Sequence, residues 1–199
     1  MYQRIAENWV YGGFLSAFVL MAFGVILVQD ATWSLVLVYL HLPIYQLHQY
    51  EEHDDDRFRV YLNNMLGGVG DVLSRNAVVF INVVGVWVLF TAVILGAALH
   101  HVGLGLAVVY PTFINALAHL GQAFVRKQYN PGLGTAVALL LPMSCLSIFI
   151  VGRSEGVETR HHLFGLSVGV VLHIAIIVHL RRRVAYFRSA NAEQFRDLQ

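Results

Sequence analysis

The segment 47–53, which reads Leu-His-Gln-Tyr-Glu-Glu-His, holds the residues best suited to chemistry. If this segment is helical, Glu51 and Glu52 follow His48 by about one turn, and both carboxylates flank its imidazole. A carboxylate one turn from a histidine is a recurrent way to hold a metal ion, as in the Glu-x-x-His motifs of di-iron bundles. The same spacing suits a carboxylate that orients a histidine or acts as a general base beside it. We therefore expect a metal or acid–base site here.

Polar residues at a matching depth interrupt two later apolar stretches. Asn115 and His119 stand four residues apart in one of them, and His173 lies within the other. His119 precedes the basic end of its stretch by seven residues and His173 by eight, which places both imidazoles roughly 10–12 Å from that end. Ionisable residues inside a membrane span are costly and usually functional. These side chains therefore predict one polar layer shared with the segment 47–53.

Three other polar residues are candidates for the same layer. His41 lies seven residues before His48 on the same helical face, His53 ends the motif segment, and Asn82 falls in the third apolar stretch. Their spacing leaves open whether any of them joins the site. The remaining histidines lie near the ends of the apolar stretches, where a histidine is simply interfacial.

The composition indicates an integral membrane protein. Of the 199 residues, 57% are hydrophobic and only 13% are charged, whereas a soluble domain carries about 25% charged residues. This balance excludes an ordinary soluble enzyme, a disordered tail and a nucleic-acid-binding domain. The single cysteine, Cys145, excludes an intrachain disulfide and argues against a cysteine-based metal site.

Six apolar stretches are long enough to cross a hydrocarbon core of roughly 30 Å, which needs about 20 helical residues. They cover residues 9–28, 32–50, 77–99, 104–125, 132–151 and 163–180. We therefore predict an all-α fold in which one domain, residues 1–199, forms a six-transmembrane-helix bundle. Eleven of the 13 Lys and Arg residues lie at the termini and in the second and fourth connections, which predicts cytoplasmic N- and C-termini. The connection 51–76 is expected to contain a short cytoplasmic amphipathic segment between the second and third spans.

At these motifs the sequence resembles the HXXEE family, a group of small bacterial integral membrane proteins named for that pattern. His48, Glu51 and Glu52 occupy the positions that give the family its name. Asn115-x-x-x-His119 looks like the second signature of the family, and the span that contains His173 fits its remaining histidine element. The resemblance extends from the second span to the sixth. It implies a bacterial cell-membrane protein with a shared site, and it names no substrate.

The site residues favour a metal-dependent membrane enzyme that hydrolyses a lipid-like or prenylated substrate. In this hypothesis a divalent metal, zinc or iron, is bound by His48, Glu51, His119 and His173. Glu52 is the base that deprotonates a metal-bound water, whose pKa a divalent metal lowers to about 7. Asn115 polarises the substrate carbonyl or holds His119 in one tautomer. The expected partners are membrane lipids and an amphiphilic small molecule that enters from the cytoplasmic leaflet, with no nucleic acid.

Two other functions stay open on the sequence. Histidine and carboxylate ligation suits iron as well as zinc, so a non-haem iron or di-iron oxygenase or desaturase is the main enzymatic alternative. A metal or small-molecule transporter is the other, although the interiors of the first, third and fifth spans carry no charged residue. The motif is similar to that of intramembrane CAAX-processing proteases, but Arg57 follows the two glutamates one residue too late and Asn115 stands in place of a phenylalanine. The metal, the substrate and the oligomeric state do not follow from the sequence.

Overall fold

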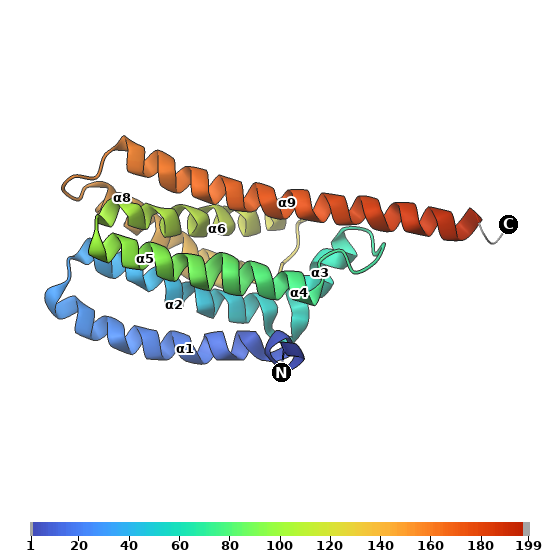
Figure 1. Ribbon diagram of the computed structural model, residues 1–199, viewed down its shortest axis with the longest axis horizontal. Helices are drawn as coiled ribbons and strands as arrows, with labels where there is room; N and C mark the ends of the chain where they lie inside the picture. The colour runs from blue at the N-terminus through green and yellow to red at the C-terminus, as the bar shows by residue number, and fades with distance from the viewer. Residues whose placement is uncertain (1, 197–199) are drawn as a thin grey trace.

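The computed structural model describes residues 2–196, and every regular element in this range is a helix. The elements are α1 Tyr2–Asp30, α2 Trp33–His53, η1 Asp54–Asp56, α3 Arg57–Met65, α4 Arg75–Val79, η2 Phe80–Val88, α5 Leu89–Leu99, η3 Val102–Gly105, α6 Leu106–Arg126, α7 Leu133–Thr135, η4 Ala136–Leu140, α8 Leu141–Gly152 and α9 Thr159–Arg196. The long helices run alongside one another as a bundle (Figure 1). This architecture confirms the predicted all-α fold class.

Five helical segments in the described range are long and apolar enough to cross a membrane. They are Gln3–Ile26, Arg75–Leu99, Val102–Arg126, Leu133–Gly152 and Thr159–Ala192. These segments coincide with five of the six predicted spans and indicate an integral membrane protein. The predicted second span corresponds to α2, whose histidine and glutamine side chains make it less apolar than the other five.

The helix α2 lies in the interior of the bundle, with α1, α5, α6 and α8 packed around it. Thr32 caps its N-terminus, because the side-chain oxygen accepts a hydrogen bond from the Leu35 amide. The buried polar residues of α2 are His41, Gln46, His48, Gln49, Glu52 and His53. A helix surrounded by other helices tolerates such residues, since their polar groups find partners inside the protein.

A sharp turn joins α2 to α3. Asp55 and Asp56 both adopt left-handed backbone conformations, with φ values of 53° and 60°. The Asp56 carboxylate accepts hydrogen bonds of 2.8 Å from Arg59 and 3.1 Å from Arg75. Partial burial favours the neutral form of Asp56, but the two guanidinium groups outweigh it and hold the pKa of this carboxyl below its ordinary value. The turn therefore directs the chain into α3, which falls within the predicted amphipathic segment.

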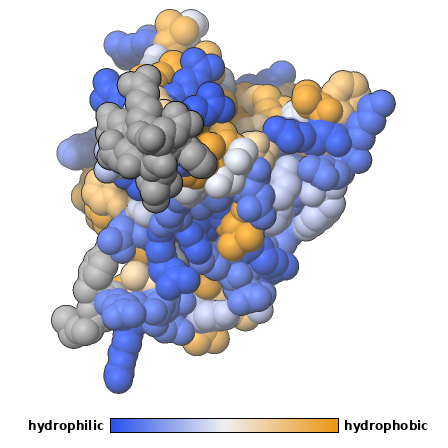
Figure 2. All heavy atoms as spheres, turned by 90° about the vertical axis from the view of Figure 1, so that its right-hand side faces the viewer, coloured by the Kyte–Doolittle hydropathy of each residue, from blue (hydrophilic) through white to orange (hydrophobic). Residues whose placement is uncertain are grey.

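The helix α9 has 38 residues, so it is about 57 Å long. It extends past the other helices at the end of the bundle towards which the first turn of α1 also lies (Figure 1). Figure 2 views this end and shows hydrophilic atoms over much of its surface. Chain ends at one end of the bundle agree with an even number of crossings, and the side of the membrane on which they lie stays a prediction.

Two glycines let α9 pack closely against α6. A Cβ atom at Gly165 would lie 2.5 Å from the Leu106 carbonyl oxygen, and one at Gly169 would lie 3.0 Å from the Pro111 nitrogen. Small residues at such contacts bring helix backbones together in membranes. Because the contacts advance along both chains together, the two helices run in the same direction. Continuing this register places His173 at about the level of Asn115.

Candidate metal centre

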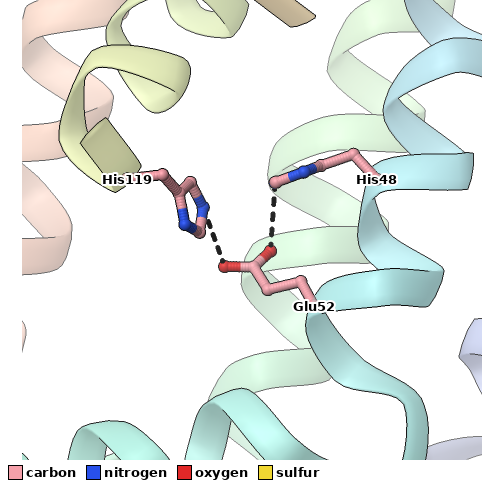
Figure 3. Close-up of side chains that lie close together, drawn as sticks. All are labelled: His48, Glu52 and His119. Atoms are coloured by element: carbon pink, nitrogen blue, oxygen red, sulfur yellow. Dashed lines mark ion pairs between the residues drawn. The ribbon is translucent and has the colours of Figure 1, made fainter. Parts of the chain in front are cut away.

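Three of the predicted site residues meet between α2 and α6 (Figure 3). His48 and Glu52 lie one turn apart on α2, and His119 comes from α6. Glu52 Oε2 is 3.6 Å from His48 Nε2, and Glu52 Oε1 is 3.5 Å from His119 Nε2. Each residue offers one ligand atom that lies within 4.8 Å of the other two. Within residues 2–196 these are the three His, Cys, Asp or Glu side chains that could hold a metal ion together.

The three side chains are shielded from solvent. His48 is 0% exposed, His119 is 4% exposed and Glu52 is 6% exposed. Among the described residues, the ion-pair partners of Glu52 are His48, His53 and His119, with no lysine or arginine. A buried carboxylate is costly without a compensating positive charge. The site therefore requires a protonated histidine or a bound cation beside Glu52.

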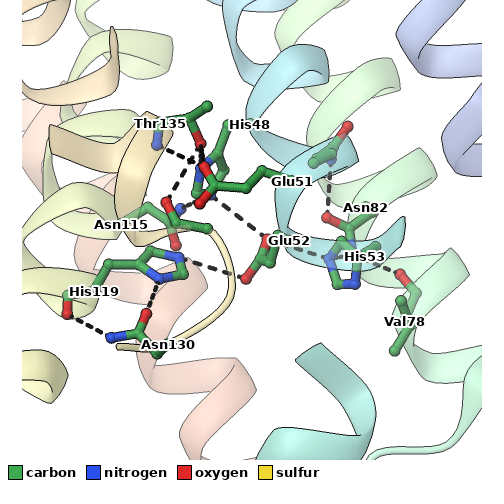
Figure 4. Close-up of polar contacts among 12 residues, drawn as sticks. His48, Glu51, Glu52, His53, Val78, Asn82, Asn115, His119, Asn130 and Thr135 are labelled. Carbon is green, nitrogen blue, oxygen red and sulfur yellow. Dashed lines mark hydrogen bonds and ion pairs between the residues drawn. The ribbon is translucent and has the colours of Figure 1, made fainter. Parts of the chain in front are cut away.

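A hydrogen-bond chain sets the tautomer of His48 (Figure 4). The Thr135 hydroxyl donates its proton to the Glu51 carboxylate. The same hydroxyl lies 2.9 Å from His48 Nδ1, so it must accept a hydrogen bond from that nitrogen. His48 therefore carries its proton on Nδ1 and presents the lone pair of Nε2 to Glu52. The amide of Asn115 donates to this Nε2 over 3.0 Å, and an ion bound at Nε2 would displace that hydrogen bond.

A second hydrogen-bond pair sets the tautomer of His119. The side-chain amide of Asn130 donates to the His119 carbonyl oxygen over 3.0 Å, which turns Asn130 Oδ1 towards the imidazole. His119 Nδ1 then donates to Oδ1 over 2.6 Å, and Nε2 of the neutral ring carries the lone pair. Hydrogen bonds to the outer nitrogen orient metal-binding histidines in this way. Both imidazoles thus aim an Nε2 lone pair at Glu52.

The loop between α6 and α7 covers the two imidazoles. Gly132 has a φ value of 92°, and a Cβ atom there would lie 2.8 Å from His48 Cε1 and 2.9 Å from His119 Cε1. Both the backbone conformation and the close approach therefore require glycine at this position. The preceding Asn130 is fully buried because it is held against His119.

Glu51, which the sequence placed among the ligands, points away from this cluster towards the residues that follow the loop (Figure 4). Its carboxylate accepts hydrogen bonds from the Tyr129 hydroxyl, the Gly134 amide at 3.0 Å and the Thr135 amide at 2.6 Å. Partial burial and the bond to this carboxylate raise the pKa of the Tyr129 phenol, which therefore acts as a donor. Glu52, expected as the base, is the carboxylate that faces both imidazoles. Successive helical residues point about 100° apart, so the two glutamates lie in different surroundings.

Of the two remaining predicted site residues, Asn115 contacts the three-residue cluster and His173 does not belong to it. His173 lies outside the three-residue cluster, and its Nδ1 donates to the Gly169 carbonyl oxygen over 2.8 Å. Asn115 contacts the cluster through a hydrogen bond to His48. Asn130 holds the tautomer of His119, which is one of the tasks that the sequence assigned to Asn115.

The residues left open by the sequence fall into two groups. His53 and Asn82 join the site from one side: His53 Nε2 is 3.2 Å from Glu52 Oε2, and the Asn82 amide nitrogen is 3.2 Å from that same ring nitrogen. Gln49 donates to Asn82 over 2.9 Å and extends the network. His41 is separate, because its Nε2 pairs with Ser147 on α8 at 3.0 Å.

Sequence reasoning missed Thr135, Asn130, Gly132 and Tyr129. It compared the depths of polar residues within apolar stretches, whereas these four residues lie in a connection or at the start of a helix. The one available signal was the Asn-Pro-Gly turn at 130–132, immediately before the fifth predicted span. A turn signal locates a loop along the chain, and it does not say which distant side chains that loop covers.

The arrangement has the chemical features of a site for one divalent metal ion. Ligand atoms around a tetrahedral ion with bonds near 2.1 Å lie about 3.4 Å apart. The separations of 3.6 Å from Glu52 Oε2 to His48 Nε2 and 3.5 Å from Glu52 Oε1 to His119 Nε2 are close to that value, each at a different oxygen, and one ligand atom from each residue lies within 4.8 Å of the other two. Two imidazoles and one carboxylate are also the protein ligands of catalytic zinc sites such as that of thermolysin, which keep a further position open.

Comparison with known proteins gives one match. The family described as "Protein of unknown function with HXXEE motif" matches residues 39–147, which is more than half of the chain. The matched range contains His48, Glu51, Glu52 and His119, whereas His173 lies beyond it. No curated protein and no solved structure matches the chain. The resemblance seen in the motifs is thus confirmed, and the chain belongs to the HXXEE family.

Proposed function

We propose that this protein is a metal-dependent membrane enzyme, in which His48, Glu52 and His119 bind one divalent ion and the substrate is a lipid-like amphiphile that is hydrolysed. The observation that carries the proposal is that the Nδ1 atoms of two imidazoles are hydrogen-bonded to Thr135 and Asn130 while both Nε2 atoms face one buried carboxylate. Orienting two imidazoles in this way takes partners from two other segments, Thr135 and Asn130. Such support is typical of a metal site and is not needed for packing alone.

In this proposal Glu52 takes the ligand role that the sequence assigned to Glu51 and keeps its own role as the base. Glu52 contributes an oxygen to the ion, and Glu51 positions His48 through Thr135. A bound divalent ion would supply a water that loses its proton near neutral pH and would polarise the bond under attack. The other Glu52 oxygen accepts that proton, with His53 Nε2 3.2 Å from Oε2 to stabilise it. Asn115 places its amide donor beside the ligands, where it can bind a substrate oxygen.

The ligand set also supports a second candidate. Two histidines and one carboxylate with open positions form the facial triad of non-haem iron oxygenases. His48, His119 and Glu52 match that composition, so oxidation of a hydrophobic substrate is the alternative reaction. The metal that the protein retains separates the two candidates, because zinc supports hydrolysis and iron supports oxidation.

The proposal includes a membrane arrangement. Helix α2 is the sixth crossing, since it has 21 residues and is surrounded by helices of the bundle. Both termini and the metal centre lie towards the cytoplasmic leaflet, from which an amphiphile reaches the site with its headgroup near α3. Reporter fusions at the two termini test this arrangement: both give cytoplasmic signals, and an external C-terminus overturns it.

The experiment that tests the function begins with metal analysis. The protein is purified without chelators, and zinc and iron per chain are measured by mass spectrometry for the wild type, H48A, H119A and H179A. His179 is exposed and does not belong to the cluster, so H179A is the matched control. We expect about one ion per chain in the wild type and H179A and a loss in the other two variants. Equal metal in all four proteins contradicts the proposed site.

The reaction is then tested on membrane lipids. Wild type, E52Q and chelator-treated wild type are incubated with total lipid extract, and the products are separated by lipid mass spectrometry. Released headgroups or acyl chains that depend on metal and on Glu52 identify hydrolysis, whereas products heavier by oxygen or lighter by two hydrogens identify the alternative. If the metal-loaded wild type yields neither kind of product, the enzymatic proposal is wrong.

A further inference from the structure

A cluster of basic residues lies where α6 and α9 leave the bundle, and we call it the basic end. Its members are exposed and take part in none of the ion pairs found among the described residues: Arg126, Lys127, Arg181, Arg182 and Arg188. Three acidic groups in the connection between α2 and α4, Asp54, Asp56 and Asp71, pair with Arg57, Arg59 and Arg75, whereas Asp55 is exposed and belongs to none of these pairs. The basic end thus has no acidic partner among the ion pairs of the described residues and carries a positive charge.

Four members of the basic end lie at one depth, and Arg188 lies about two turns farther along α9. Gly165 contacts Leu106, and Gly169 contacts Pro111, so α6 and α9 run in parallel with an offset of just under 60 residues. Both helices rise by 1.5 Å per residue, and the same offset brings residues 181–183 level with the last turn of α6. The cations on α6 and α9 therefore lie side by side at the basic end and do not form two separate patches.

Apolar side chains directly above the basic end show where the membrane begins. Phe124 is 85% exposed and Val125 is 77% exposed, although both are strongly hydrophobic. Tyr129 and Tyr186 are also exposed, at 60% and 61%, and aromatic residues of this kind mark the membrane–water interface. The basic end therefore lies at the level of the lipid headgroups.

A polar stripe on α6 connects the basic end to the metal centre. Asn115, His119, Gln122 and Arg126 follow one another at helical positions i, i+4, i+7 and i+11, which share one face. Gln122 Oε1 is buried and has no hydrogen-bond partner within the described structure. Buried polar atoms without partners are rare, and this one lies between the ligand His119 and the cation Arg126. The stripe thus places polar groups on α6 between the membrane surface and the metal centre.

We infer that the basic end binds the anionic headgroup of a phospholipid. The chemistry that fits it is a phosphate ester carried by acyl chains, because the cations accept the charge while Phe124 and Val125 contact the chains. If the metal centre has the proposed function, its substrates are anionic amphiphiles. Zwitterionic lipids carry a positive group that the basic end repels.

Lipid binding is measured directly on the detergent-solubilised protein by native mass spectrometry. Phosphatidylglycerol and phosphatidylcholine with identical acyl chains are titrated into wild type, into R126Q/K127Q/R181Q/R182Q and into the control R153Q/R160Q, which removes Arg153 after α8 and Arg160 in the first turn of α9. Each cation near an anionic surface contributes roughly fivefold in affinity. We expect the variant with four substitutions to bind phosphatidylglycerol at least tenfold more weakly than the wild type. The control should bind as the wild type does.

Three results overturn the inference: equal affinity for both lipids in the wild type, equal losses in the variant with four substitutions and the control, or full competition by inorganic phosphate, which would indicate a site for a free anion. The same titration on H119A separates this inference from the metal proposal. H119A lacks a proposed ligand but retains the basic end, so it binds phosphatidylglycerol like the wild type. The variant with four substitutions should keep its metal, which would show that lipid binding and metal binding are lost independently.

Discussion

Replacing Glu51 and Glu52 by glutamine, one at a time, should produce two opposite defects although the residues are adjacent. Glu52 faces the Nε2 atoms of His48 and His119, so E52Q removes a charged ligand and should abolish metal retention. Glu51 is bound to the start of α7, so E51Q should chiefly destabilise the fold. We therefore expect one carboxylate to affect metal binding and the other to affect local stability.

The expected sizes follow from the contacts. Each Glu51 oxygen accepts two hydrogen bonds, from Tyr129 and Gly134 at Oε1 and from the amide and hydroxyl of Thr135 at Oε2. An amide group at either oxygen leaves two donors without an acceptor, which costs about 2 kcal/mol after allowance for partial exposure. For a chain of this size that is a fall of about 4–8 °C in Tm. Loss of His48 orientation lowers metal affinity by roughly 10–100-fold as well.

E52Q should behave differently in both measurements. Its metal affinity falls by more than the loss of an orienting residue costs, because a ligand is removed. In chelator its Tm stays equal to the wild-type value or rises, since glutamine replaces a buried charge that has only histidines beside it. The variant thus unfolds normally while binding no metal.

The assay combines thermal unfolding in excess chelator with metal analysis of the untreated proteins. E155Q serves as the control, because Glu155 is an exposed carboxylate in another connection. The reasoning is refuted if E51Q loses all its metal at an unchanged Tm while E52Q is destabilised and keeps its metal. That outcome would make Glu51 the ligand, as the motif alone suggested.

Three further changes test the support of the site. Thr135→Val should weaken metal binding by about 10–100-fold, whereas Thr135→Ser keeps it, as measured by competition with a chromophoric chelator; equal affinities would exclude the role of the hydroxyl. Gly132→Ala should lower both Tm and metal content, because its Cβ atom would collide with His48 and His119, and an unaltered Tm would contradict this close packing. Asp56→Asn should lower Tm at neutral pH. Because the folded pKa of Asp56 is depressed, its contribution is complete above the ordinary value of 3.8 and disappears as the pH falls further, so wild type and variant should converge in acid. A difference in Tm that does not depend on pH would refute this explanation.

Much of the fold was accessible from local sequence, because the membrane imposes a simple rule. A stretch of about 20 apolar residues has to be helical in a bilayer, where each backbone polar group needs a partner within its own segment. The spacing of His48 and Glu52 by one turn follows from helix geometry alone, and counting residues from the basic end places His119 near the same depth. Depth along a helix is a local property, and the sequence is sufficient to estimate it.

The direction in which each side chain points was decided only by tertiary packing. Rotation of α2 about its axis depends on the helices around it, and this rotation turns Glu52 to the imidazoles and Glu51 to the start of α7. His173 matches the predicted depth, but its Nδ1 is bonded to its own helix and it lies outside the cluster. The orienting contact of Thr135 joins residues 87 positions apart, so no local pattern records it. The sequence thus determined which residue types are available and their depth along the helices. The packing of the bundle determined which of these side chains meet.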